Sequence, residues 1–99
     1  MTMDETKILS KAFKALSNPN RLTLFLNLVK ETEMNVDAGE EHSCFVAPLI
    51  QNLSVGAPTV SHHIKELVNA GLIHTERHGK QLLCTVDTSM VERLRRALE

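Results

Sequence analysis

The chain opens with two stretches in which apolar residues recur at helical spacing, residues 6–16 and 19–30. Asn18 followed by Pro19 indicates the N-cap and the first position of the second helix. In the first helix the apolar residues share one side; they are Ile8, Leu9, Ala12, Phe13 and Leu16. In the second they nearly surround the helix; they are Leu22, Leu24, Phe25, Leu26, Leu28 and Val29. The first pattern predicts an amphipathic helix, and the second a central buried helix.

The next segment, residues 31–43, is polar and without period, so we expect a loop longer than the usual ~4–6 residues. Such a loop is either a mobile spacer or an insertion related to an effector. Residues 44–46 then form a candidate short strand. Residues 47–53 are expected to be a short helix with inward-facing leucine and isoleucine side chains, namely Leu49, Ile50 and Leu53.

Residues 54–73 combine a turn, an amphipathic helix and a stop signal in that order. Gly56 suits the turn, and Pro58 suits the first helical position, where a missing N–H costs nothing. Ala70 and Gly71 end the helix. Its predicted buried stripe is Val60, Ile64, Leu67 and Val68. Together with the preceding short helix, this pattern predicts a helix-turn-helix over residues 47–70.

The same helix leaves short or cationic hydrogen-bonding side chains on its other side. Such groups reach phosphates and base edges in DNA complexes, although a merely solvated helix face is the alternative. His62 and His63 are adjacent, so a helix turns them about 100° apart, and we expect partial burial of His63. The candidate DNA-contacting residues of this helix are Thr59, Ser61, His62, His63, Lys65 and Asn69.

Two strand-like runs follow, residues 72–77 and 81–86, around a short Gly-containing loop. A hairpin directly after a recognition helix is a wing, over residues 72–86. Arg77, His78 and Lys80 at its tip would lie against the DNA backbone or enter a narrow minor groove. The alternative is a surface hairpin with no ligand.

A last helix can begin after Asp87 or after Ser89, and Ser89 with Glu92 has the spacing of a capping box. Its apolar stripe is Met90, Val91, Leu94 and Leu98. Because so small a domain leaves such a stripe little to pack on, we expect the first and last helices to form a homodimer interface. A two-fold pair would place two recognition helices in successive major grooves.

Composition limits the fold and the location. With 99 residues, 42% of them hydrophobic, we expect one domain over residues 1–99, mainly α with a small β-hairpin wing, in the α+β class. No apolar run approaches the ~18 residues that a membrane span needs. No signal-peptide pattern opens the chain, so a cytoplasmic protein is expected.

The net charge of −1 is unevenly distributed. Residues 31–41 hold five acids and no Lys or Arg, whereas residues 1–30 hold five Lys or Arg against two acids. Local basic faces can therefore bind phosphate in a salt-dependent way, and Arg21 is a candidate phosphate contact. Without Tyr or Trp the chain lacks platforms for stacking single-stranded nucleic acid, which favours double-stranded DNA as the partner.

In this order of elements the chain resembles the ArsR/SmtB family of winged helix-turn-helix repressors over nearly its whole length. The segment Lys14-Ala15-Leu16-Ser17-Asn18-Pro19-Asn20-Arg21-Leu22 is similar to that family's entry into its second helix. Residues 58–64 and 70–73 are similar to its recognition segment. The resemblance implies a homodimeric repressor of an inverted-repeat operator that leaves the DNA when an unidentified small effector binds or reacts.

The family's metal sites do not transfer to this chain. Its third-helix box reads Glu-Leu-Cys-Val-Cys-Asp-Leu, and the aligned residues 43–49 carry Phe45 and Ala47 at both cysteine positions. Residues 87–99 contain no histidine, which excludes the family's other common site. We therefore expect no metal and no cofactor. A metal-responsive repressor with a non-standard site remains an alternative.

The two cysteines suggest another effector chemistry. If the short strand pairs with the second wing strand, Cys44 and Cys84 face each other at ~4.5–5.5 Å between Cα atoms, within reach of a disulfide. Two buried thiols that only pack are the alternative. Oxidation there would couple thiol chemistry to the wing.

Other function classes are less well supported. A winged helix can also serve as a protein-docking module that does not bind DNA. An enzyme is not expected, because no nucleophile has an evident base and the four glycines form no phosphate-binding loop.

Overall fold

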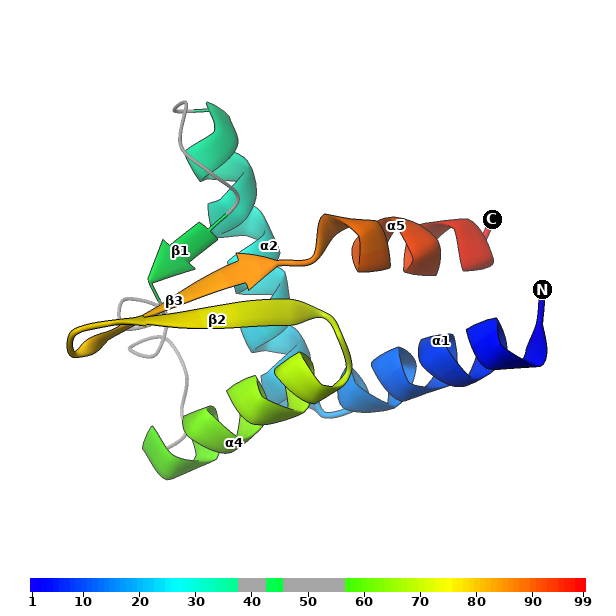
Figure 1. The fold of residues 1–99 in the computed structure, drawn as a ribbon, viewed down its shortest axis with the longest axis horizontal. Helices are drawn as coiled ribbons and strands as arrows, with labels where there is room; N and C mark the ends of the chain where they lie inside the picture. Colours follow the sequence, from blue (N-terminus) through cyan, green and yellow to red (C-terminus); the bar gives the residue numbers. More distant parts are fainter. Residues whose placement is uncertain (38–42, 46–56) are drawn as a thin grey trace.

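The computed structural model describes residues 1–37, 43–45 and 57–99, and Figure 1 shows their arrangement. The described residues form four helices and three strands. In chain order these are α1 (Met3–Ala15), α2 (Pro19–Asp37), β1 (Ser43–Phe45), α4 (Ala57–Asn69), β2 (Ile73–His78), β3 (Gln81–Val86) and α5 (Thr88–Ala97). The predicted helix over residues 47–53 lies outside the described residues.

The starts of α1, α2 and α5 are set by side-chain caps. The Thr2 hydroxyl accepts a hydrogen bond from the Glu5 backbone N–H at 3.1 Å, so α1 begins earlier than the pattern predicted. Asn18 Oδ1 accepts from the backbone N–H groups of Asn20 and Arg21 at 3.0 and 3.1 Å, as an N-cap does. Of the two predicted caps of α5, Asp87 is the one observed, and it accepts from the Met90 N–H at 3.0 Å.

Helix α2 corrects the prediction of a loop from residue 31, because it continues to Asp37. Residues 31–37 contain no Gly or Pro and include good helix formers such as glutamate and methionine, so nothing in them stops a helix. Helix α2 is also not buried all round. Leu24, Phe25 and Leu28 lie in the core, whereas Leu26 is 54% exposed.

The strands form one antiparallel sheet in the order β1-β3-β2. The predicted pairing of the short strand with the second wing strand is confirmed, and Cys44 is directly opposite Cys84. In the β2–β3 hairpin, hereafter the wing, His78 pairs with Gln81, so Gly79 and Lys80 alone form the loop. Gly79 has φ +61°, which matches the two-residue turn with glycine at its first central position.

The end of α4 is a Schellman motif, which turns the chain into the wing. The Leu72 N–H donates to the Leu67 carbonyl at 3.0 Å, and the Gly71 N–H donates to the Val68 carbonyl at 3.0 Å. Gly71 has φ +77°, a value that residues with a side chain rarely adopt. The predicted stop at this glycine is therefore confirmed.

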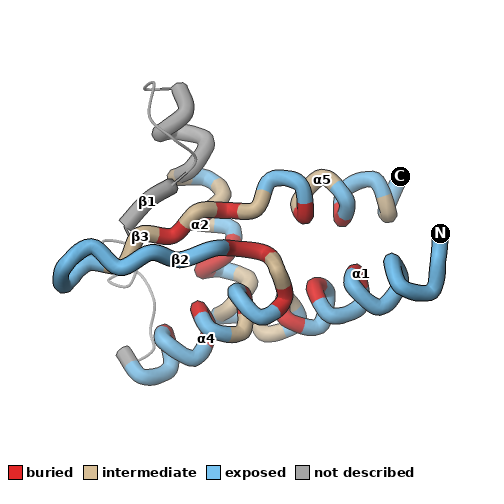
Figure 2. Tube along the Cα trace, in the orientation of Figure 1, coloured by how far each residue is buried: buried red, intermediate tan, exposed pale blue. Residues whose placement is uncertain are grey.

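The core lies where the helices meet the inner ends of β2 and β3, as the red segments of Figure 2 show. Its fully buried large side chains are Leu24, Leu28, Val60, Leu67, Leu72, Ile73 and Cys84. Two members of the predicted α1 stripe, Ile8 and Phe13, are each 40% exposed. Among the described residues no helix is long and apolar enough to cross a membrane.

Candidate nucleic-acid interface

Helix α4 has one buried and one exposed face. Val60, Ile64 and Leu67 are buried as predicted, whereas Val68 is 36% exposed because it lies at the edge of the stripe. The opposite face is polar and exposed, so the candidate DNA-contacting side chains on it are accessible. It consists of Thr59, Ser61, His62, Lys65 and Asn69.

The wing extends from the molecule beside α4, at the left of Figure 1. Beyond buried Ile73, every residue of β2 is exposed, which leaves Arg77 and His78 at the tip in solvent together with Lys80 of the turn. His78 Nε2 lies 3.6 Å from a carboxylate oxygen of Glu76. The three predicted tip residues are thus accessible to a ligand.

A groove of about 320 Å³ joins α4 to the wing. Ser61 and Lys65 line it from α4, and Thr75 and Arg77 line it from β2. Its apolar lining comes from Ile64, Val68 and Leu82. We name this feature the wing groove. It brings three sequence-predicted residues together with Thr75, which the sequence reasoning missed although it alternates along β2 with Arg77.

His63 does not belong to the exposed face, which corrects its place among the DNA contacts. It is only 3% exposed, because it follows Val60 by three positions and precedes Leu67 by four, on the buried side of α4. Arg21 Nε donates to His63 Nδ1 at 3.3 Å. Within the described residues the other ring nitrogen has no partner. Burial lowers the pKa of His63 below its usual value, and the positive charges of Arg21 and His62 act in the same direction.

Arg21 is half-buried and links three elements. Besides His63 of α4, its Nη1 donates to the Ala15 carbonyl of α1 at 3.1 Å, while its backbone N–H is bound by Asn18. The guanidinium is therefore held in place within the fold, whereas the sequence suggested only a phosphate contact.

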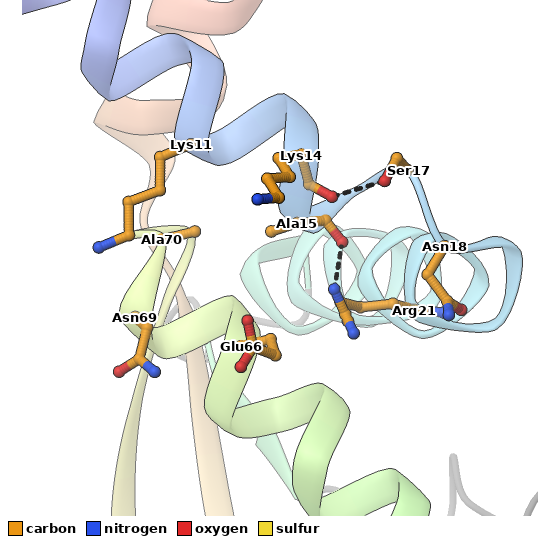
Figure 3. A pocket seen from close by; sticks show the side chains of 9 residues that line it. All are labelled: Lys11, Lys14, Ala15, Ser17, Asn18, Arg21, Glu66, Asn69 and Ala70. Carbon is orange, nitrogen blue, oxygen red and sulfur yellow. Dashed lines mark hydrogen bonds between the residues drawn. The ribbon is translucent and has the colours of Figure 1, made fainter.

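Arg21 also lines a hollow of about 440 Å³ between α1, the start of α2 and the end of α4 (Figure 3). Lys11 and Lys14 of α1, with Asn69 and Glu66 of α4, are further lining residues. We name this hollow the basic pocket. The sequence reasoning missed the two lysines, although they are three positions apart and so share a helix face.

The remaining candidates from the sequence are the two cysteines and groups of side chains that could bind a metal. Cys84 is buried in β3, and β1 brings the backbone of Cys44 opposite it. In the part of the chain that the structure describes, no three His, Cys, Asp or Glu side chains group as metal ligands.

The sequence is similar to those of known bacterial regulatory proteins. Residues 40–75 match the model described as "Bacterial regulatory protein, arsR family". The arsenical resistance operon repressor of Staphylococcus xylosus is 29% identical over 93 residues, covering 94% of this chain and 79% of that protein. The cadmium resistance transcriptional regulatory protein CadC homolog of Staphylococcus aureus is 32% identical over 85 residues, covering 86% of this chain and 62% of that protein.

Solved structures share the fold. The ArsR-like transcriptional regulator from Rhodococcus sp. RHA1 superposes with a TM-score of 0.72 at 17% identity, over 97% of this chain and 80% of that chain. The segment matched by the family model contains β1, α4 and the start of β2.

Proposed function

Since this chain belongs to the arsR family of bacterial regulatory proteins and is a DNA-binding transcriptional regulator, not an enzyme, we propose that it is a homodimeric repressor of an inverted-repeat operator. Its exposed α4 face inserts into the major groove, which admits an α-helix. The wing meets the adjacent backbone. The observation that carries this proposal is the wing groove, which joins the polar face of α4 to β2 in one surface.

The chemistry of this surface supports two kinds of contact. Ser61, His62 and Asn69 offer donors and acceptors of the type that read base edges. Lys65, Arg77 and Lys80 offer positive charge for phosphates, and their exposure on a chain of net charge −1 concentrates cationic groups where DNA would lie. Binding should therefore combine sequence preference with a steep dependence on salt.

A direct test compares the operator with random duplex. The wild-type protein is titrated with DNA from its own upstream region, containing an imperfect inverted repeat with half-sites ~10 bp apart, and with random duplex over a salt series. We expect tighter operator binding at every salt concentration. Equal affinity for both duplexes at moderate salt would overturn the proposal. Salt-insensitive binding to a protein partner would favour a docking module instead.

The homodimer part of the proposal is supported by apolar side chains left exposed on the terminal helices. Met1, Phe13 and Leu98 line an open hollow between the start of the chain, α1 and the end of α5, and Leu98 is 76% exposed. Figure 1 shows both chain ends at this side of the molecule, away from the wing. A second copy of the chain, in the cytoplasm with the DNA, would cover this surface.

We further propose that the effector acts by thiol oxidation between Cys44 and Cys84. The support is their direct opposition in the β1–β3 ladder. Two thiols would lose two protons and two electrons to an oxidant such as a peroxide, which is reduced as the disulfide forms. The disulfide would join β1 to the wing strand and change how the wing sits against α4.

The test is reversible loss of operator affinity with peroxide, with a Cys44–Cys84 disulfide seen by mass spectrometry of the non-reduced protein. Peroxide should leave a Cys44→Ser/Cys84→Ser variant bound to the operator. If that variant responds like the wild type, the two cysteines are only packing residues.

A further inference from the structure

The basic pocket collects three cationic side chains against one carboxylate. Lys11 and Lys14 approach from α1, Arg21 from the first turn of α2, and Glu66 from α4. Figure 3 shows these side chains around the space between α1 and the end of α4, with Lys11 extending from α1 on the side of Ala70. No ion pair joins any of the four to another described residue, so none of the three cationic groups is paired with a carboxylate in the described part of the chain.

Arg21 gives this pocket a fixed donor group. Its guanidinium has five N–H donors, and the bonds to the Ala15 carbonyl and His63 Nδ1 use two of them. The remaining donors have no acceptor among the described residues. A guanidinium held in one orientation loses little further entropy when it binds an oxyanion, and its planar donors match the geometry of phosphate.

The position of the basic pocket relative to α4 indicates which part of a bound DNA duplex would lie next to the pocket. Lys65 and Val68 line the wing groove, whereas Glu66 and Asn69 line the basic pocket. At about 100° per residue Val68 and Glu66 lie at opposite edges of the exposed face, about 160° apart, with Lys65 and Asn69 between them. A helix in the ~12 Å wide major groove has a phosphate backbone along each edge. The wing serves one edge, and the basic pocket lies at the other.

We propose that the basic pocket binds a phosphate group, and that in the DNA complex this is a backbone phosphate across the major groove from the wing. The inference rests on the proposed function of α4. Lys11, Lys14 and Arg21 provide the charge, and Asn69 links the pocket to the DNA-facing surface. Glu66 weakens the positive potential and limits how tightly an anion is held.

The DNA arm of the test uses charge-neutralising variants. Lys11→Gln/Lys14→Gln should bind operator and random duplex on the order of tenfold more weakly, with a salt slope smaller by about 1–2. Lys30→Gln is the control, because this exposed α2 residue is distant from the pocket along the helix, and its binding should stay within twofold of wild type. Glu66→Gln should act in the opposite direction and tighten binding to both duplexes. Thermal unfolding of each variant checks that the fold is retained.

A second arm identifies the source of the phosphate. Wild-type protein and the double variant are titrated with inorganic phosphate while the amide signals of Asn18 and Asn69 are followed by NMR. Loss of affinity in the DNA arm assigns the pocket to the DNA backbone. Unchanged DNA binding, together with saturable phosphate shifts that the double variant lacks, assigns it to a free phosphate.

Failure in both arms overturns the phosphate site. If Ser61→Ala and Lys80→Gln still weaken operator binding in that case, the proposed function stands without this pocket. If wild-type protein does not prefer operator to random duplex, the proposed function has failed instead.

Discussion

Helix α4 and the terminal helices α1 and α5 are all amphipathic, but they differ in what they leave outside. Around its buried stripe α4 exposes mainly polar residues, such as Ser61 and Lys65. Helix α1 and the C-terminal end of α5 instead expose apolar groups, with Phe13 40% and Leu98 76% exposed. The polar face suits a hydrated, charged duplex, and the apolar surface suits a second apolar surface that excludes water.

This contrast separates the two roles, DNA binding and pairing with a second copy, that the proposed function assigns to one small fold. The outward side chains of α4 lie outside the core, to which the buried face contributes Val60, Ile64 and Leu67. In α5, Met90 and Leu94 are each 8% exposed, so most of the stripe predicted for the dimer is used inside the protomer. Leu98 is the member of that stripe that stays largely exposed. The proposed dimer interface is therefore best tested at Leu98.

The largest effect is expected from Leu98→Glu. Two-fold pairing would bury this carboxylate twice, so we expect the dimer dissociation constant to rise ~100-fold or more, about 3 kcal/mol, with loss of tight operator binding. Sedimentation equilibrium measures the dimer. Leu26→Glu, at a leucine that is 54% exposed on α2, is the matched control and should remain dimeric. A fully dimeric Leu98→Glu protein at micromolar concentration would place the interface elsewhere.

The next effect concerns sequence reading by the polar face of α4. Ser61→Ala or His62→Ala should each reduce operator preference by ~1–3 kcal/mol if the side chain contacts a base. Fluorescence anisotropy with operator and random duplex measures it. Affinity for random duplex is the internal control and should change little. Equal losses on both duplexes would show that these residues contact only the backbone.

A smaller and non-specific effect is expected at the wing. Lys80→Ala removes a charge from an exposed turn, so binding to all duplexes should weaken several-fold and the salt slope should fall by about 1 for each phosphate that is no longer neutralised. Salt titrations of Lys80→Ala against Lys30→Ala give the comparison. Should the slopes of these two variants agree, the wing does not bind phosphate.

The smallest expected effect is a pH dependence of stability caused by His63, the polar residue on the buried face of α4. Since the pKa of His63 is lowered in the fold, the unfolded chain binds a proton near pH 6.5 before the native protein does. The free energy of unfolding should therefore fall as pH decreases from about 6.5 toward the native pKa. Urea unfolding at several pH values measures it. His63→Gln should lose this dependence, whereas His62→Gln on the exposed face should keep it.

Much of the fold could be predicted because its signals are local. The Asn18-Pro19 start of α2, the stop at Gly71 and the hairpin around Gly79 all rest on the backbone preferences of one or two residues. The exposed residues of α4 could also be predicted, because a 3.6-residue period assigns them to one side. The end of α2 could not, since polar residues without Gly or Pro are compatible with both helix and loop.

The sequence by itself determined the order of the described elements and the polar face of α4, because caps, glycines and helical periodicity act over a few residues. Only the tertiary structure decided which groups from distant segments meet. Arg21 and His63 are 42 positions apart, and their contact depends on how α4 packs against α2. The wing groove and the basic pocket likewise arise where separate elements pack together. No local pattern encodes such contacts, because they depend on the three-dimensional placement of whole helices and strands.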